Sequence, residues 1–82
     1  MPAVLRVFGL RVGILTNDHG PAHVHIVGGG KEAKFFLNCP GGPPALYENY
    51  GFKLSELSDI QAELEKAIGD LCRKWSEIHG DL

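Results

Sequence analysis

The sequence has 82 residues, of which 44% are hydrophobic and 22% charged, and its formal net charge is −2. A chain this short buries only about 60% of its unfolded surface, so we expect one domain, residues 1–82, of marginal stability. No apolar run approaches the roughly 18 residues of a membrane span, and the start MPAVLRVFGLRV lacks a signal-peptide core. These features predict a cytoplasmic protein with no membrane partner.

The charges are divided unevenly along the chain. Residues 1–54 carry five Lys/Arg against three Asp/Glu, a net charge of +2, whereas residues 55–82 carry three against seven, a net charge of −4. The low total net charge argues against nonspecific binding of nucleic acid.

The two cysteines, Cys39 and Cys72, lie far apart and lack the spacing of a zinc ribbon or a CxxC redox motif. We therefore expect reduced thiols, as is usual in a cytoplasmic protein. Neither cysteine has an obvious activating neighbour, so neither is predicted to be a nucleophile.

Glycine and proline interrupt the first half of the chain, and the segments between them are rich in Val, Ile, Leu and Phe. This pattern predicts strands at about 3–8, 11–17, 23–28 and 32–38. Short connections around Gly9 and at Gly28–Gly30 favour hairpins, and hence a four-stranded antiparallel meander. The segment CPGGPP (39–44) predicts a stiff loop, and ALYENYG (45–51) a short turn or helix.

From Ser55 onward, apolar residues recur every three or four positions, which predicts one long amphipathic helix over about 55–79. Ser55 is the predicted N-cap and Gly80 the predicted stop. Packing this helix on the sheet gives a two-layer α+β fold. The apolar stripe comprises Leu57, Ile60, Leu64, Ile68, Leu71, Trp75 and Ile78.

Strand alternation separates the predicted sheet into two faces. Val24 and Ile26 fall on the core face, and their companions are Ala3, Leu5, Val7, Leu10, Val12, Ile14, Ala33, Phe35 and Leu37. The opposite face collects Arg6, Arg11, His23, His25, Glu32 and Lys34, together with Phe8, Leu15 and Phe36.

This mixed apolar and cationic face suggests a binding surface. The predicted contact residues are Arg6, Phe8, Arg11, Leu15, Lys34 and Phe36. A second interpretation is that the tail of the chain or a second copy, in a homodimer, covers the face. A third is that Phe8 and Phe36 stack single-stranded bases, aided by Arg6 and Arg11.

Three of the four histidines, His19, His23 and His25, lie in TNDHGPAHVHIVGGG (16–30). In one interpretation they bind a divalent metal such as zinc, because His23 and His25 point the same way on a strand and His19 approaches from the preceding loop. Asp18 would then be a fourth ligand or accept an imidazole N–H.

Two further interpretations stay open. In acid/base catalysis, Asp18 would orient His19 or His23, and nearby cations would neutralise a phosphodiester, giving histidine-dependent RNA cleavage. Otherwise Asn17, Asp18 and Pro21 simply shape a turn, and His23 and His25 are half-exposed surface residues.

The stretches MPAVLRVFGLRV, NDHGPAHVHI, GGGKEAKFFLN and YGFKLSEL, followed by a helix with Trp75, resemble the small bacterial proteins grouped as domain of unknown function 4160. The resemblance covers nearly the whole chain, and NDHGPAHVHI is its most specific part. It marks as signature positions Asn17, Asp18, His19, Pro21, His23 and His25. This sequence departs from the family in Ala22, where a second proline is common, and in the insertion at 39–44.

The resemblance implies a cytoplasmic protein encoded beside a small partner of the domain of unknown function 2442 type, in what has been suggested to be a toxin–antitoxin-like pair. We therefore expect a partner-binding protein that uses the strand face of His19, His23 and His25. The alternative is a histidine-dependent hydrolase or ribonuclease, with or without a metal.

Overall fold

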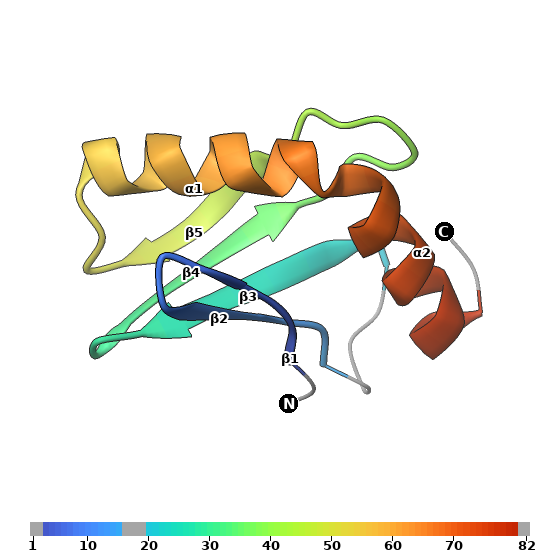
Figure 1. The fold of residues 1–82 in the computed structure, drawn as a ribbon, viewed down its shortest axis with the longest axis horizontal. Coiled ribbons are helices and arrows are strands. Elements are labelled where there is room, and N and C mark those ends of the chain that lie inside the picture. The colour runs from blue at the N-terminus through green and yellow to red at the C-terminus, as the bar shows by residue number, and fades with distance from the viewer. Residues whose placement is uncertain (1–2, 16–19, 81–82) are drawn as a thin grey trace.

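A computed structural model describes residues 3–15 and 20–80 of the chain. Within these residues, one antiparallel sheet with strand order β1-β2-β3-β4-β5 is followed by two helices, which confirms the α+β class (Figure 1). The elements are β1 (Ala3–Val7), β2 (Leu10–Gly13), β3 (His23–Gly28), β4 (Lys31–Phe36), β5 (Ala45–Tyr50), α1 (Leu54–Lys66) and α2 (Ile68–His79).

Two of the hairpins close through turns of two residues that both have positive φ. Gly29 and Gly30, with φ of 59° and 75°, connect β3 to β4, and Phe8 and Gly9, with φ of 53° and 77°, connect β1 to β2. Turns of this type match the right-handed twist of the strands and favour glycine or asparagine at both positions. Phe8 is therefore an unusual residue in its turn.

The predicted number of strands is wrong, because residues 45–50 form a fifth strand rather than a turn or helix. β5 pairs with β4, and its register shifts between Lys34, opposite Glu48, and Phe35, opposite Leu46. Tyr47 is the extra residue of this β-bulge. A bulge lets two successive side chains share one face, which hides the strand alternation from a sequence pattern.

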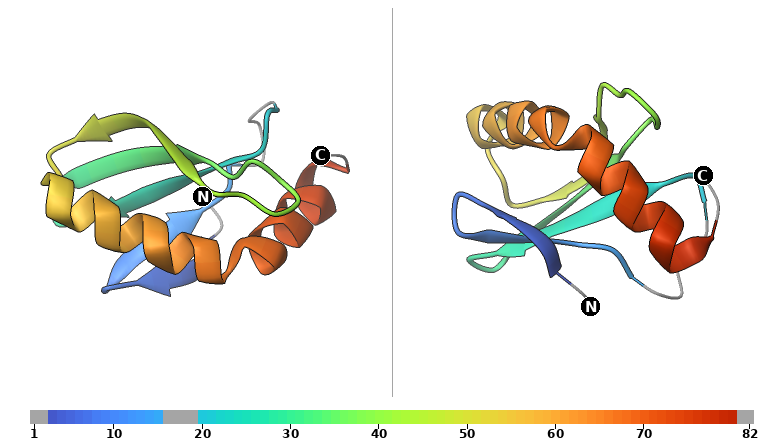
Figure 2. Two further views of the ribbon diagram at one scale, coloured as in Figure 1. Left: turned by 90° about the horizontal axis from the view of Figure 1, so that it is seen from above. Right: turned by 45° about the vertical axis from the view of Figure 1, so that its right-hand side comes forward.

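The predicted single helix is two helices that meet at Ala67. α1 runs along one side of the sheet, and α2 turns across the end where β2 finishes and β3 begins (Figures 1 and 2). α1 begins after Lys53 rather than at Ser55, and the Lys53 backbone N–H donates to Glu56 Oε1 at 2.8 Å. Gly80 ends α2 in the left-handed conformation, as predicted. Among the described residues, no helix has the length and apolar character needed to cross a bilayer.

Strand alternation predicted the core face of the sheet correctly. Leu5 and Leu10 are partly buried, and the side chain of Ala3 lies outside the described part of the structure. Trp75 is in the core, as expected from the apolar stripe. The buried core comprises Val7, Val12, Ile14, Ala22, Val24, Ile26, Ala33, Phe35, Leu37, Phe52, Leu57, Ile60, Leu64, Leu71, Cys72 and Trp75.

The expectation of reduced thiols is wrong in the structure, where Cys39 and Cys72 form a disulfide with Cα atoms 5.8 Å apart. Cys39 lies in the loop between β4 and β5, and Cys72 lies on the buried side of α2. The bend at Ala67 brings α2 to this loop. The disulfide therefore joins the second helix to the end of the sheet.

Candidate functional site

His23 and His25 are buried, with 8% and 5% of their surfaces exposed, so the interpretation of half-exposed surface residues is wrong. His23 Nδ1 lies 2.9 Å from the carbonyl oxygen of Pro21. Because a carbonyl oxygen can only accept, this Nδ1 carries the proton. We call the sheet face that bears both side chains the histidine face.

His25 lies beside a carboxylate on the same face. Its Nδ1 is 3.5 Å from Glu32 Oε2, and the Glu32 side chain is 43% exposed. The ring centroids of His25 and His23 are 5.4 Å apart. The Glu32 carboxylate therefore lies beside His25, one of two neighbouring imidazoles on this face.

The fourth histidine, which none of the predicted sites includes, joins α2 to the end of the sheet. His79 Nε2 donates to the Leu15 carbonyl oxygen at 3.0 Å, and its ring lies 4.0 Å from that of Trp75. The Trp75 ring in turn lies 5.2 Å from that of His23. His23 therefore takes part in the packing between α2 and the sheet.

An ion pair joins β4 to the edge strand β5 on the histidine face. Lys34 Nζ lies 3.4 Å from Glu48 Oε2, and the Tyr50 hydroxyl donates to the same carboxylate oxygen at 3.2 Å. Partial burial acts to lower the pKa of Lys34, but the charge and hydrogen bond of Glu48, with smaller contributions from neighbouring groups, outweigh it and raise this pKa. Lys34 is therefore a cation whose charge is already neutralised within the protein, by Glu48.

The bulge in β5 adds aromatic surface to the histidine face. The Tyr47 ring stacks on Phe36 with centroids 4.1 Å apart, and it meets the His23 ring edge-on at 5.8 Å. Tyr47 is 37% exposed and Tyr50 is 61% exposed. These tyrosines were missed at the sequence level because their segment was predicted to be a turn or helix.

At the other side of the same face, two arginines oppose each other. Arg6 and Arg11 are Cα partners across β1 and β2, and both are exposed. Within the described residues, neither pairs with a carboxylate. The row that begins with them continues through Val27 and Glu32 to Tyr50. An exposed cationic end and an exposed aromatic end therefore share one row of the sheet.

Two of the predicted catalytic and metal residues, Asp18 and His19, lie outside the described residues, as does the signature residue Asn17. In the described residues, no group of three His, Cys, Asp or Glu side chains is arranged to hold a metal ion. The metal interpretation therefore stays a prediction.

The predicted contact residues are not all brought together. Arg6, Arg11, Lys34 and Phe36 lie on the histidine face, whereas Leu15 is half-buried beside the end of α2. Phe8 instead lines a cavity beside α1. Phe8 and Phe36 therefore do not form one platform for stacked bases, which corrects the third interpretation of that face.

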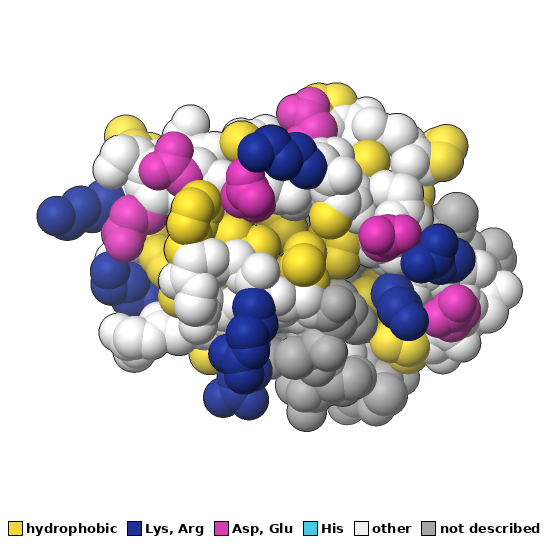
Figure 3. All heavy atoms as spheres, viewed as in Figure 1, with side chains coloured by type: hydrophobic (Ala, Val, Ile, Leu, Met, Phe, Trp, Pro, Cys, Tyr) yellow, Lys and Arg dark blue, Asp and Glu magenta, His cyan; other side chains and the backbone are white. Residues whose placement is uncertain are grey.

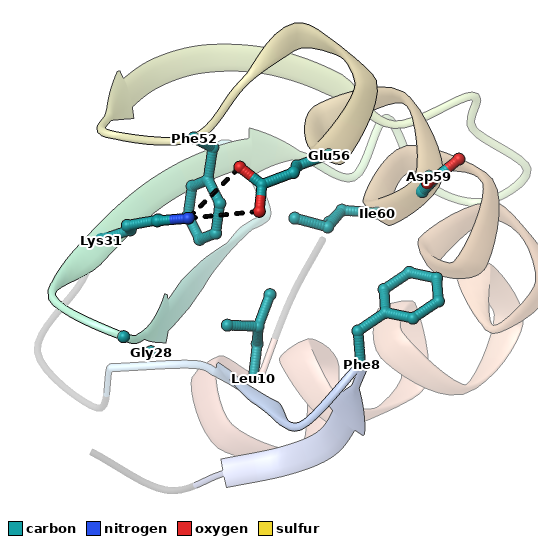
Figure 4. A pocket seen from close by; sticks show the side chains of 9 residues that line it. Phe8, Leu10, Gly28, Lys31, Phe52, Glu56, Asp59 and Ile60 are labelled. Atoms are coloured by element: carbon teal, nitrogen blue, oxygen red, sulfur yellow. Dashed lines mark hydrogen bonds and ion pairs between the residues drawn. The ribbon is translucent and has the colours of Figure 1, made fainter.

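This cavity, of about 200 Å³, lies between the β1–β2 turn and α1. Lys31 Nζ contacts both carboxylate oxygens of Glu56, at 3.3 and 3.2 Å, and lies 5.6 Å from the Phe52 ring centroid (Figure 4). The backbone N–H of Lys53 and the ammonium of Lys31 lower the pKa of Glu56. Sequence reasoning missed this cavity, since its lining residues come from three separate parts of the chain. The lining comprises Phe8, Leu10, Gly28, Gly29, Lys31, Phe52, Glu56, Asp59 and Ile60.

The sequence was also compared with known proteins. No match was found among curated proteins or among solved structures. The model of the family described as Domain of unknown function (DUF4160) matches residues 9–76, which is most of the chain and includes the histidine segment and both helices up to Ser76. The chain therefore belongs to the DUF4160 family.

Proposed function

We propose that this protein binds a partner protein through the histidine face. The observation that carries the proposal is the opposed pair Arg6 and Arg11, exposed and without a carboxylate partner among the described residues. Like charges directly opposite each other on two strands destabilise a sheet. A partner that supplies carboxylates to both guanidinium groups would offset this cost.

The remainder of the histidine face suits the same kind of partner. Tyr47 and Tyr50 present partly exposed rings at the β5 side, and tyrosine and arginine are enriched among the residues that dominate protein interfaces. The partner would thus combine an acidic patch with an apolar one. The candidate partner that the family resemblance implies is the small protein of the domain of unknown function 2442 type, in a toxin–antitoxin-like pair.

Under this proposal the histidines support the surface rather than forming it. His23 and His25 are nearly fully buried, and they contact Trp75, Tyr47 and Glu32. Their contribution is to hold the bulge tyrosine and the strand in place. The exposed arginines and tyrosines would make the contacts.

The test is co-expression of the full chain with the neighbouring gene product, followed by titration calorimetry of the purified proteins. Charge reversal in Arg6→Glu with Arg11→Glu is expected to weaken binding by at least tenfold, because it replaces attraction by repulsion. The matched control is Arg73→Glu, an exposed arginine on α2 that pairs with Asp70. Absence of a complex, or equal loss of affinity in the control, would refute the proposal, and a homodimer blocked by the same reversal would replace it.

A second candidate function rests on the contact of His25 with Glu32. A carboxylate at an imidazole Nδ1 orients the ring, as in general acid/base catalysis. RNA cleavage would then require His25, and Glu32→Gln would reduce the rate without unfolding the protein. Elemental analysis of protein purified without an affinity tag separates the metal-dependent version from the metal-free one. Equal cleavage by His25→Asn and the unaltered protein would exclude this candidate.

A further inference from the structure

The cavity beside α1 lies away from the histidine face, and the proposed partner contact does not use it. Figure 4 shows Phe8, Leu10 and Ile60 directed toward one space, with Asp59 at one edge and the Lys31–Glu56 pair at the other. Leu10 and Ile60 belong to the core side of the sheet and to α1. In the space-filling view from the same side as Figure 1, apolar side chains are exposed beneath α1 with acidic groups beside them (Figure 3).

The charges in the cavity leave one carboxylate unmatched. Glu56 is paired with Lys31, whereas the side chain of Asp59 makes no ion pair or hydrogen bond with another described residue. The lining therefore carries one cation and two anions. The helix that borders the cavity adds to this negative charge. α1 has a single basic residue, Lys66, against four acidic residues, Glu56, Asp59, Glu63 and Glu65.

One cation, the ammonium group of Lys31, is already bound among the residues that line the cavity. The Lys31 ammonium lies over the face of Phe52 while it contacts both oxygens of Glu56. A cation within about 6 Å of a ring centroid is attracted by the ring quadrupole. Phe8 and Asp59 offer the same two kinds of group, an aromatic ring and a carboxylate, at the other edge.

Phe8 is placed there at a conformational cost. It occupies a turn position with φ of 53°, which favours asparagine or glycine, and its side chain is 67% exposed. Neither turn formation nor core packing explains a phenylalanine at this position. A ligand that covers the ring would explain it, since strained residues are often found where a ligand is held.

We propose that this cavity binds a lysine or arginine side chain presented by a polypeptide. The aliphatic stem would lie against Leu10, Ile60 and Phe8, and the cationic group would contact Asp59. The volume of about 200 Å³ is smaller than the roughly 300–1,000 Å³ of sites for drug-sized ligands, so it suits a single long side chain. Gly28 and Gly29 also line the cavity, and having no side chains they present only backbone to a bound segment.

The experiment uses the full chain labelled with ¹⁵N and follows the amide signals of Phe8, Gly28 and Gly29 by NMR. Three probes are titrated: lysine blocked at both ends, blocked norleucine, which keeps the stem without the charge, and free pentylamine. Blocked lysine is expected to give saturable shifts with a Kd in the millimolar range, and blocked norleucine to bind at least about threefold more weakly. Pentylamine is expected to bind no more tightly than blocked lysine.

Two variants and one matched control locate the site. Asp59→Asn removes the unmatched carboxylate and Phe8→Leu removes the ring, and each is expected to weaken lysine binding about two- to fivefold. Glu65→Gln removes the same charge from an exposed position of α1 outside the cavity, and it is expected to leave binding unchanged.

Specific results would overturn the inference. Equal binding of blocked norleucine would show an apolar cavity without cation preference, and unchanged binding in Asp59→Asn would exclude the assigned carboxylate. No saturable shift at all would remove the site. Tighter binding of pentylamine than of blocked lysine would reject a polypeptide as the source. None of these results bears on Arg6 and Arg11, so the proposed partner contact is tested separately.

Discussion

Cys39 and Cys72 are joined by a disulfide that connects the loop after β4 to the second helix. The two cysteines are 33 residues apart, and the segment between them contains β5 and all of α1. Closing a loop of this length in the unfolded chain removes conformational entropy that folding would otherwise have to overcome. The disulfide is therefore expected to add stability to a fold whose core is small.

The first prediction concerns this disulfide. Replacing both cysteines by alanine is expected to lower the free energy of unfolding by about 2–4 kcal/mol. Urea unfolding followed by circular dichroism measures the change, and dithiothreitol should destabilise the unaltered protein to a similar extent. The double variant is the control, because a reductant should leave its midpoint unchanged. Two free thiols in the purified, non-reduced protein would contradict the prediction.

Cysteine spacing alone could not reveal this pairing, because the approach of Cys39 to Cys72 depends on the bend between the helices. The stripe from Leu57 to Ile78 has the spacing of one continuous helix, and Gly69 is the only local feature near the bend. The bend at Ala67 is set instead by a tertiary contact, the packing of α2 across the end of the sheet. Disulfides are uncommon in the cytosol, so the cysteines no longer support the cytoplasmic prediction, which stays untested.

The second prediction concerns the strained turn at Phe8. Phe8→Asn is expected to raise the free energy of unfolding by up to about 1 kcal/mol, because asparagine tolerates positive φ and the exposed ring contributes little to the core. Gly9→Ala is the opposite change, because it introduces a Cβ at a position with φ of 77°, where glycine is favoured. A Cβ there would meet no atom within 4 Å, so its expected destabilisation of about 1 kcal/mol would come from the backbone alone. Destabilisation by Phe8→Asn would show that the ring supports the fold.

The third prediction concerns the structural part played by His23. His23→Ala removes the hydrogen bond to Pro21 and the contact with Trp75, and is expected to lower the free energy of unfolding by about 1–3 kcal/mol. Arg11→Ala, an exposed change on the adjacent strand that also relieves the repulsion with Arg6, should not lower the free energy of unfolding by more than about 0.5 kcal/mol. Thermal and urea unfolding of both variants measure the difference. Equal stability of the two variants would argue that His23 is kept for chemistry rather than for packing.

The sequence predicted the sheet well where alternation was regular, and poorly where it was interrupted. β3 was predicted at its observed bounds, and Val24 and Ile26 face the core as expected. In β5 the bulge puts Tyr47 and Glu48 on one face, so the period of two is lost and the segment resembled a turn. The candidate site depends on that bulge, which is why its tyrosines were missed although its arginines were found.

The last prediction concerns pH and the start of α1. The Lys53 backbone N–H and the Lys31 ammonium both favour the charged form of Glu56, so its pKa in the folded protein lies below the ordinary value of 4.5. A carboxylate with a lowered folded pKa stabilises the fold above its unfolded pKa, and this contribution is lost as the pH falls through the folded value. We therefore expect the unfolding free energy of the unaltered protein to fall more steeply below pH 4.5 than that of Glu56→Gln, which retains an oxygen that can accept from Lys53.

Urea midpoints measured from about pH 6 to about pH 3 test this expectation for Glu56, with Glu65→Gln as the control that removes a charge from an exposed position of the same helix. Because only Glu56 bonds to the helix start and to Lys31, the Glu65→Gln curve should follow that of the unaltered protein, and parallel curves for all three proteins would show that this carboxylate does not hold the helix start in place.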